Sequence, residues 1–494
     1  MKSFATHLVF LLAVFSSLSC SYNQTTRRPE LVLTSKETEQ QLGEREAAKV
    51  EAAMGLVDDP QLTEYVSAIG QRLAAQSPSE GYEFDFYVVD MKEPNAFALP
   101  GGKVYVSRGI LALANSEDEL AGVIGHEVAH VLGRHTGHRI TLGAPLTLVT
   151  GITAGLTSII SPGLGNLIGG IGGATQGILL SPYDRHQERQ ADDLGLKLAA
   201  GAGWDPAALS HILHSLEREE DLRGSGDGLA FFASHPRTPE RVRNTGRAAK
   251  KLQRGPGEPI AASRAQFLAK LDGLVVADNP ARGVFDGGTF IQPEMGFALQ
   301  FPKEWKHQNS PDQVIAAPSE EDAVVILKIA GEGDDPKPVA EAVAKKQGLD
   351  ASKLTREVEI NGLEAVRSRS ITGGSRRKKV AVEATWIAFG GAVYQIVSAT
   401  SPDDVGRYHN DFVRIPHSFH DATPTDLARV KVDRLRLRKA RRGETIAGLV
   451  ARVGSIWTAD EAAIANAVET DTVLDAGFLA KAPERETYRP KRSR

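Results

Sequence analysis

The sequence has only one cysteine, Cys20, among its 494 residues. A disulfide within the chain needs two cysteines, and Cys-rich zinc or iron–sulfur sites need more, so both are excluded. An excess of basic charge is also lacking, because 58 Lys and Arg stand against 62 Asp and Glu, which gives a net charge of −4. Without a global positive field, we expect no nucleic-acid partner.

Compositional bias is absent as well. Hydrophobic residues make up 41% of the chain and charged residues 24%, as in an ordinary soluble protein. These values exclude a mainly disordered chain, a collagen and a transporter with many membrane spans. Since one domain usually takes roughly 100–200 residues, the length predicts about three domains.

The N-terminus has the pattern of an export signal. The apolar run from Leu8 to Leu18 is too short for a membrane span but suits the hydrophobic part of a secretory signal. We therefore predict a signal peptide over residues 1–19 and a lipid anchor on Cys20, which would hold the protein at the outer membrane in a bacterial periplasm. Ser17 departs from the large aliphatic residue that a lipidation signal prefers there, so an exported protein with a free Cys20 is the alternative.

The pattern of hydrophobic residues changes at a Gly/Pro-rich segment over residues 254–257. Helical periodicity dominates before this segment, and alternating strand patterns begin near Phe285. We predict a multidomain protein with these parts: a signal peptide (1–19), a tether (20–42), a mainly α domain with a small edge sheet (43–255), a linker (256–284), an α+β domain of unknown role (285–422), a small βααβ domain (426–486) and a tail (487–494).

Residues 126–130 read His-Glu-Val-Ala-His, on a predicted helix with a capping box at 116–119. Histidines four residues apart share one helix face, so His126 and His130 can both reach one zinc ion. Glu127 lies beside them, where its carboxylate can hold and deprotonate a water molecule. An ordinary amphipathic helix with two histidines is the alternative.

A site with two histidines needs a third ligand, and two patterns compete for it. The longer motif HExxHxxGxxH fits at Gly133, but its third histidine would fall on Thr136. Glu188 and Asp192 stand four residues apart on another predicted helix, where Glu188 would complete a site that keeps a position open for water and substrate. Asp192 would then hydrogen-bond a ligand imidazole. A solvated helix face is the alternative for this pair.

Four motifs resemble, in order, those of the gluzincin family of HtpX and the CAAX prenyl proteases. They are Asn-Ala-Phe-Ala-Leu-Pro-Gly-Gly at 95–102, the motif at 126–130, Glu-Arg-Gln-Ala-Asp at 188–192 and Ser-His-Pro at 234–236. The resemblance covers about half of the chain and is to the exported, BepA-like branch, which has no transmembrane helices.

This resemblance implies a role for each matching residue. His126, His130 and Glu188 would bind one zinc ion per chain, with Glu127 as general base. The remaining implied roles are an acidic partner and proton donor (Asp192), a fourth ligand or transition-state donor (His235), a supporting residue (Arg241) and an edge strand to which an extended substrate adds (Asn95, Ala96, Phe97 and Ala98).

Other histidines and one apolar stretch are predicted to lie outside this chemistry. We expect His135 and His138 to be exposed and to have no metal role, and His211 and His214 to lie on the surface. The stretch from 140 to 183 carries no charged residue. We predict apolar helices or loops there, which flank the active site and touch the membrane or an unfolded protein, with a hairpin of membrane helices as the alternative.

Residues 435–482 resemble a LysM module. The segment from Arg442 to Leu449 is similar to its start, which implies a βααβ fold and contact with peptidoglycan; a structural cap is the alternative. The stretch from Arg429 to Arg442 contains eight basic residues in 14. It is a strand with a solvated cationic face or a contact for anionic envelope polymers.

These features together predict a zinc metalloendopeptidase of the bacterial cell envelope. By resemblance, its substrates are unfolded, misfolded or misassembled envelope proteins. The alternative is a latent or non-proteolytic chaperone or scaffold that acts in envelope assembly.

Overall fold

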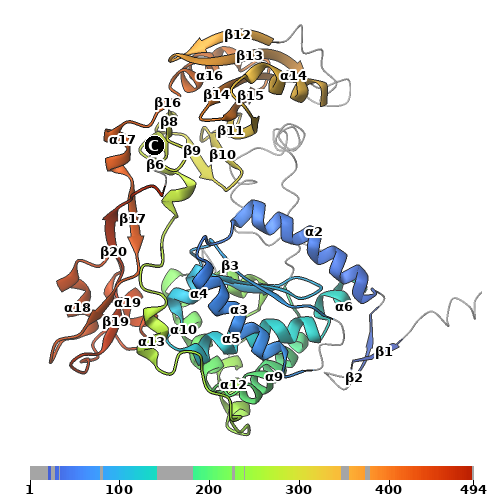
Figure 1. The fold of residues 1–494 in the computed structure, drawn as a ribbon, viewed down its shortest axis with the longest axis vertical. Coiled ribbons are helices and arrows are strands. Elements are labelled where there is room, and N and C mark those ends of the chain that lie inside the picture. The colour runs from blue at the N-terminus through green and yellow to red at the C-terminus, as the bar shows by residue number, and fades with distance from the viewer. Residues whose placement is uncertain are drawn as a thin grey trace, which may run out of the picture. The chain divides into compact units, whose positions relative to one another are not determined.

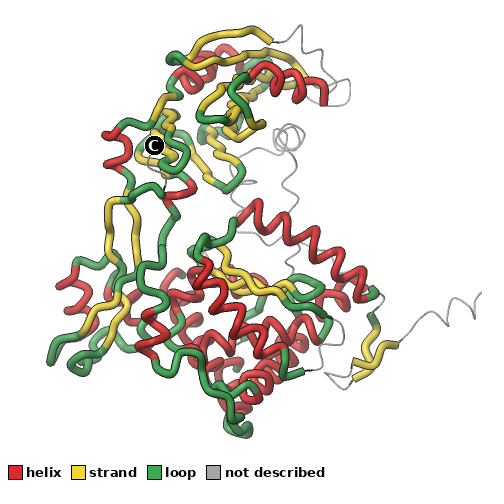
Figure 2. Tube along the Cα trace, in the orientation of Figure 1, coloured by secondary structure: helices red, strands yellow, loops and turns green. Residues whose placement is uncertain are grey.

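The structure is a computed structural model, shown in Figures 1 and 2. It describes residues 20–23, 28–32, 34–77, 82–141, 182–224, 229–238, 240–346, 355–372 and 379–491. The predicted signal peptide and nearly all of the uncharged stretch lie outside the described residues. Within the described part, no helix is both long and apolar enough to cross a membrane.

The chain forms two compact units. The first spans Met1–Thr150, Ile178–Val276 and Asp433–Glu484, and the second contains Ala277–Val432 and Arg485–Arg494. The first unit is therefore discontinuous, because the segment 433–484 packs with residues up to Val276 while the intervening residues 277–432 belong to the second unit.

Helices make up most of the first unit. In chain order they are α2 (Lys36–Met54), α3 (Pro60–Ala74), α4 (Arg108–Leu113), α5 (Glu117–Leu132), α6 (His135–Thr141), α9 (Arg185–Gly201), α10 (Ala208–Arg223), α11 (Ala230–Ser234), α12 (Arg241–Ala249), α13 (Arg264–Ala269), α18 (Ile446–Val453) and α19 (Ala459–Ala465). Side-chain caps fix several starts: Asp59 accepts from the backbone of Leu62 in α3, and Ser116 accepts from that of Glu119 in α5.

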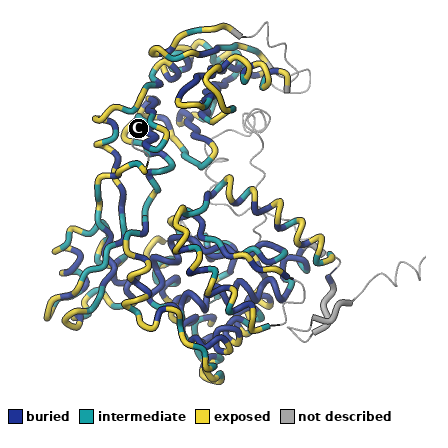
Figure 3. Tube along the Cα trace, viewed as in Figure 1, coloured by how far each residue is buried: buried dark blue, intermediate teal, exposed yellow. Residues whose placement is uncertain are grey.

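A small sheet lies against these helices, as the sequence predicts. It has the order β3-β5-β4, in which β3 (Asp85–Val89) runs parallel to β5 (Lys103–Ser107) and β4 (Ala96–Ala98) runs antiparallel to it. α3 packs on β3 and α5 packs on β4, so the sheet and helices bury one continuous apolar core. In Figure 3 the interior of the first unit, where α5 lies, is largely dark blue, the colour of buried residues.

The segment predicted as a tether contains structure of its own. β1 (Cys20–Asn23) pairs antiparallel with β2 (Arg28–Leu31), which places Cys20 opposite Leu31. α2 follows and its Gly43 lies so close to the carbonyl of Pro100 that an added Cβ would be 1.9 Å from that oxygen. α2 thus packs directly on the loop that follows β4.

The second unit is rich in antiparallel strands. Its larger sheet has the order β12-β13-β14-β15-β11-β10-β9 and its smaller sheet β16-β8-β7-β6. Their bounds are β6 (Val284–Asp286), β7 (Thr289–Gln292), β8 (Phe297–Gln300), β9 (Lys306–Asn309), β10 (Gln313–Ala317), β11 (Ala323–Glu332), β12 (Thr355–Ile360), β13 (Leu363–Thr372), β14 (Val380–Phe389), β15 (Ala392–Thr400) and β16 (His420–Asp421), with helices η1 (Pro280–Arg282), α14 (Pro336–Lys346), α16 (Val405–His417) and α17 (Pro424–Arg429).

The larger sheet is covered on both faces. Alternate residues of β10 and β11 belong to two separate apolar clusters, one with α16 and one with α14. Such two-sided burial explains why these strands are more continuously apolar than a half-exposed strand.

The end of the first unit has the predicted βααβ order. β18 (Leu437–Lys439) and β19 (Leu479–Lys481) pair antiparallel and flank α18 and α19. β17 (Lys431–Arg434) and β20 (Glu484–Thr487) form a separate two-stranded ribbon. The LysM-like character of this segment and its glycan binding both stay predictions.

Lys481 attaches this βααβ module, defined as residues 437–481, to the end of α4, just before the motif helix α5. Its side chain is fully buried, and its Nζ donates to the carbonyls of Ala112, Leu113 and Ala114 at 2.7, 3.0 and 2.7 Å. These carbonyls lie at the C-terminal end of α4, where a cation is favoured by the helix dipole. Asn115 adds a hydrogen bond from its amide to the carbonyl of Ala465 at 3.0 Å.

Candidate metal centre

The helix α5 carries the His-Glu-Val-Ala-His motif through the interior of the first unit. Every residue from Glu119 to Leu132 is buried. The motif therefore does not lie on the solvated face of an ordinary amphipathic helix.

Glycines bring α9 into direct backbone contact with α5. A Cβ atom built on Gly195 would lie 2.9 Å from the backbone nitrogen of His126, so any side chain there would push the helices apart. Asp192 and Glu188 precede Gly195 by about one and two turns on α9. Asp192 therefore lies beside His126, and Glu188 lies beside His130. A capping box at Asp184 fixes the start of this helix.

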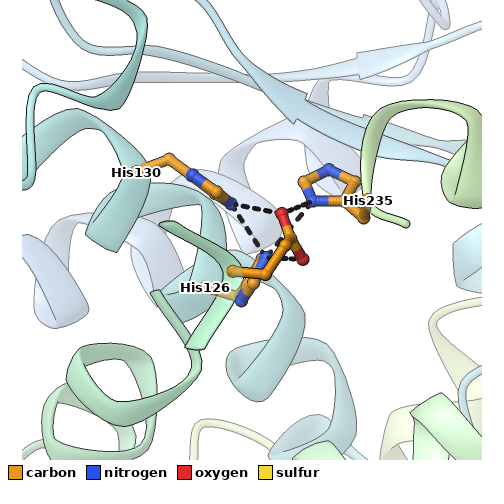
Figure 4. Close-up of side chains that lie close together, drawn as sticks. His126, His130 and His235 are labelled. Carbon is orange, nitrogen blue, oxygen red and sulfur yellow. Dashed lines mark hydrogen bonds and ion pairs between the residues drawn. The ribbon is translucent and has the colours of Figure 1, made fainter. Parts of the chain in front are cut away.

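Four side chains from three parts of the chain meet at this crossing, as Figure 4 shows for the histidines. His126, His130, Glu188 and His235 each offer one ligand atom, and these atoms all lie within 4.8 Å of one another. Oε1 of Glu188 lies 3.3 Å from Nε2 of His130 and 3.0 Å from Nδ1 of His235. Thr136, where the competing motif needs a histidine, has its hydroxyl 3.4 Å from that of Tyr183 instead.

Asp192 and Arg241 flank this cluster and form hydrogen bonds and ion pairs with its members. Oδ1 of Asp192 lies 2.9 Å from Nδ1 of His126, which leaves Nε2 of that ring for the cluster. Arg241 is buried and donates to both oxygens of Asp192, at 2.9 and 2.8 Å. Its Nη1 also lies 2.8 Å from Oε2 of Glu188. One guanidinium therefore compensates two buried carboxylates.

The environment shifts the pKa values of these groups in opposite directions. Burial alone would raise the pKa of Glu188 and Asp192, but Arg241 and the adjacent histidines outweigh it and hold both values below the usual range. For Glu127 burial dominates, and it raises the pKa. Burial also holds the pKa of His130 well below its usual value, so this imidazole is neutral, the form that ligates metals.

Polar atoms without partners indicate that the cluster fits a cation. Among the described residues, both oxygens of Glu127 and Nε2 of His235 are buried without a hydrogen bond, although Nε2 of His235 lies 3.4 Å from Oε1 of Glu127. A buried polar atom left unpaired costs about 1–3 kcal/mol. Two imidazoles and a carboxylate with a further position open are the ligands of catalytic zinc, so the residues present fit one zinc ion.

His135 is not exposed, and the prediction that it would be is wrong. Only 2% of its surface is accessible, and its Nδ1 lies 2.8 Å from Nδ1 of His130. The cause is local, because Arg134 has a φ of 52°. This left-handed residue turns the chain after α5, so that the ring of His135 lies against that of His130. His138 is half-buried, while His211 and His214 are exposed as expected.

The sequence gives little sign of Tyr183, which lies against the cluster. Its ring stacks on that of His130, with centroids 3.7 Å apart and planes at 20°. The guanidinium of Arg139 lies 4.0 Å from the centroid of the tyrosine ring. With Ala98, Pro100 and His130, Tyr183 lines a small hollow beside the cluster. Its one signal is its place immediately before the capping residue of α9.

The predicted substrate strand lies at one edge of the small sheet. Ala96, Phe97 and Ala98 pair with Val106, Tyr105 and Val104 of β5, and β4 has no second partner among the described strands. The backbone N–H of Asn95 donates to Oγ of Ser107 at 2.8 Å, which fixes the start of the strand.

Comparison with known proteins gives a family for the region that holds the cluster. Residues 60–248 match the model of Peptidase family M48. The chain is 30% identical over 238 residues to a beta-barrel assembly-enhancing protease of Yersinia pestis, covering 47% of this chain and 48% of that protein. It is 29% identical over 220 residues to the protein of that name in Escherichia coli strain K12, covering 44% of each.

A third relative comes from a eukaryote. The mitochondrial metalloendopeptidase OMA1 of Schizosaccharomyces pombe is 34% identical over 181 residues, which cover 37% of this chain and 51% of that protein. The chain thus spans about half the length of the curated relatives that it matches.

Proposed function

We propose that the protein acts as a zinc-dependent metalloendopeptidase, on the premise that residues 60–248 are a zinc metallopeptidase domain of family M48. The observation that carries this proposal is that the side chains of His126, His130 and Glu188 lie close together and buried, beside Glu127. Zinc in such a site polarises the scissile carbonyl and the attacking water.

The chain's own residues supply the proton transfers and the orientation. Glu127 takes a proton from the attacking water and returns it to the leaving amine. Asp192 orients His126, and it is the acidic partner that the family resemblance implies as a proton donor. Arg241 supports Asp192 and Glu188 through the ion pairs described above.

Two variants separate the base from the ligand. Glu127→Gln is expected to keep one zinc ion per chain and to abolish cleavage of an unfolded protein such as casein, because an amide cannot accept the proton. Glu188→Ala is expected to lower the zinc content, because a ligand is lost. Metal analysis and proteolysis with and without a chelator measure both effects. Cleavage by Glu127→Gln at the wild-type rate, or full zinc in Glu188→Ala, would contradict these roles.

The edge strand supports a proposal for how substrate binds. A peptide that pairs with β4 along Asn95–Ala98 would run past the cluster, since β4 packs on α5. Such pairing uses main-chain groups of the substrate and so suits extended, unfolded chains of varied sequence.

The cellular setting is a further part of the proposal. The export pattern at the N-terminus and two relatives named beta-barrel assembly-enhancing proteases support action on misfolded or misassembled proteins of the bacterial envelope. A lipid on Cys20 would anchor the protein to the outer membrane, and residues 435–482 would contact peptidoglycan. Membrane fractionation of a Cys20→Ser variant and a peptidoglycan pull-down test these two contacts.

His235 favours a second candidate, a latent protease that acts as a chaperone or scaffold. Its Nδ1 is a fourth potential ligand, and its Nε2 lies 3.4 Å from Oε1 of Glu127. If His235 closes the site, His235→Ala raises casein cleavage. If His235 instead donates a hydrogen bond to the transition state, the same change lowers cleavage while zinc content is retained.

A further inference from the structure

We propose that His135 is a positioning residue that holds His130 in the tautomer required for metal binding, and that Gln190 and Gly133 keep His135 in place. This inference rests on the metal centre of the proposed function. It starts from a contact between two rings, the 2.8 Å separation of Nδ1 of His130 from Nδ1 of His135.

The tautomers follow from the partners of each ring nitrogen. Nε2 of His130 faces the cluster, 3.0 Å from Nε2 of His126 and 3.3 Å from Glu188. A nitrogen that ligates a metal must carry a lone pair, so the proton of neutral His130 lies on Nδ1. His135 must then accept that proton's hydrogen bond with its own Nδ1 and carry its proton on Nε2.

Gln190 completes the chain of hydrogen bonds. Its Oε1 lies 3.0 Å from Nε2 of His135, where it accepts the remaining ring proton. The amide of Gln187 also donates to the backbone carbonyl of His135 at 3.1 Å. α9 therefore presents Glu188 to the cluster and two glutamines to the residue that orients His130.

Gly133 gives the ring of His135 its space. A Cβ atom at this position would lie 2.5 Å from Nε2 and 2.9 Å from Cδ2 of His135. The φ of Gly133 is −75°, which any residue adopts. The glycine is therefore required by the ring beside it and not by its backbone conformation.

The two motif histidines are oriented by different acceptors. His126 has the carboxylate of Asp192 at its Nδ1, at 2.9 Å, whereas His130 has a neutral imidazole. Partners of this kind fix the ring and its tautomer, and their loss typically lowers metal affinity about 10- to 100-fold. We expect an effect of this size for loss of His135.

The test compares two variants of similar volume in the full chain. His135→Asn keeps an oxygen that can accept from His130, whereas His135→Leu has no acceptor. Zinc affinity is measured by titrating metal-free protein in competition with a chromogenic chelator, and the cobalt-substituted protein gives an absorption spectrum that reports ligand geometry. We expect the affinity of His135→Leu to fall about 10- to 100-fold and its cobalt spectrum to change, while His135→Asn stays within a few-fold of wild type.

A second variant protects the test against a folding defect. Gly133→Ala removes no polar group but displaces the ring, so it is expected to lower zinc affinity as His135→Leu does; thermal unfolding of metal-free proteins serves as the folding control. Wild-type affinity in both His135→Leu and Gly133→Ala would overturn the inference, as would equal losses in the Asn and Leu variants. If the wild type itself binds no zinc, the proposed function fails instead.

Discussion

Two glutamates at the cluster show how one cation sets the charge of a buried site. Glu127 and Glu188 are both buried, yet only Glu188 has a guanidinium beside it. Burial disfavours a carboxylate, and a cation within about 4 Å favours it. The pKa of Glu188 is therefore lowered and that of Glu127 raised, which suits a ligand in one case and a base in the other.

Removing the cation should make stability depend differently on pH. In wild-type protein the lowered pKa values of Glu188 and Asp192 contribute stability above their unfolded values of about 4, and this is lost as pH falls through the folded values. In Arg241→Leu burial would raise these pKa values, so the charged carboxylates would oppose folding near neutral pH. We expect a loss of about 3–5 kcal/mol at pH 7 that shrinks towards pH 4.

Urea unfolding of metal-free protein at several pH values measures this loss. Arg243→Leu is the matched control, since Arg243 lies on the same helix and is exposed. A loss in Arg241→Leu that is constant with pH would show that packing, and not charge, is responsible.

At the scale of elements, the crossing of α5 and α9 determines whether the two ligand motifs meet. The contact is close because Gly195 has no side chain at the backbone of His126. Each helix could form without the other, but the cluster exists only at this separation.

Two glycine substitutions should therefore have opposite effects. Within a helix, Gly→Ala normally stabilises by about 0.8–1 kcal/mol. Gly246→Ala is expected to do so, because its nearest neighbour would be 3.4 Å from the new Cβ. Gly195→Ala is expected to destabilise and to lower zinc affinity, because α9 must move away from α5. Thermal unfolding and zinc titration measure both, and stabilisation by Gly195→Ala would refute the close-contact argument.

The same elements show what the sequence could and could not predict. The spacing of His126 to His130 and of Glu188 to Asp192 predicts two helix faces, and the strand pattern before them predicts β4. That these faces meet depends on a glycine contact between residues 125–126 and 195, which has no periodic signal. His135 was predicted to be exposed because the left-handed turn at Arg134 cannot be recognised from a non-glycine residue. Tyr183 contributes through stacking, which leaves no spacing pattern.

At the scale of the whole molecule, the βααβ module is part of the first unit. Residues 433–484 pack in one compact unit with the cluster, although residues 277–432 separate them from the rest of that unit in the sequence. Lys481 is the centre of this attachment, because its buried Nζ donates to three backbone carbonyls at the end of α4. The surface around Lys481 is covered, so any glycan contact would use another face of the module.

Loss of this lysine should weaken the entire unit. Lys481→Met leaves three carbonyls at the end of α4 without their donor, and we expect a loss of about 2–5 kcal/mol in the free energy of unfolding. Lys439→Met is the matched control on the paired strand, where the side chain is exposed. Hydrogen exchange of α5 should accelerate in Lys481→Met alone. Unchanged exchange in α5 would mean that the module is an independent attachment.

Because the first unit is discontinuous in the sequence, its parts are translated at different times. Residues 60–248 leave the ribosome early, but Lys481 follows only after Ala277–Val432 of the second unit have been made. The segment that leads into α5 thus lacks this contact until Lys481 has been translated. A chain that ends before Lys481 would carry the candidate metal ligands without this support, which delays completion of the first unit until that residue has been made.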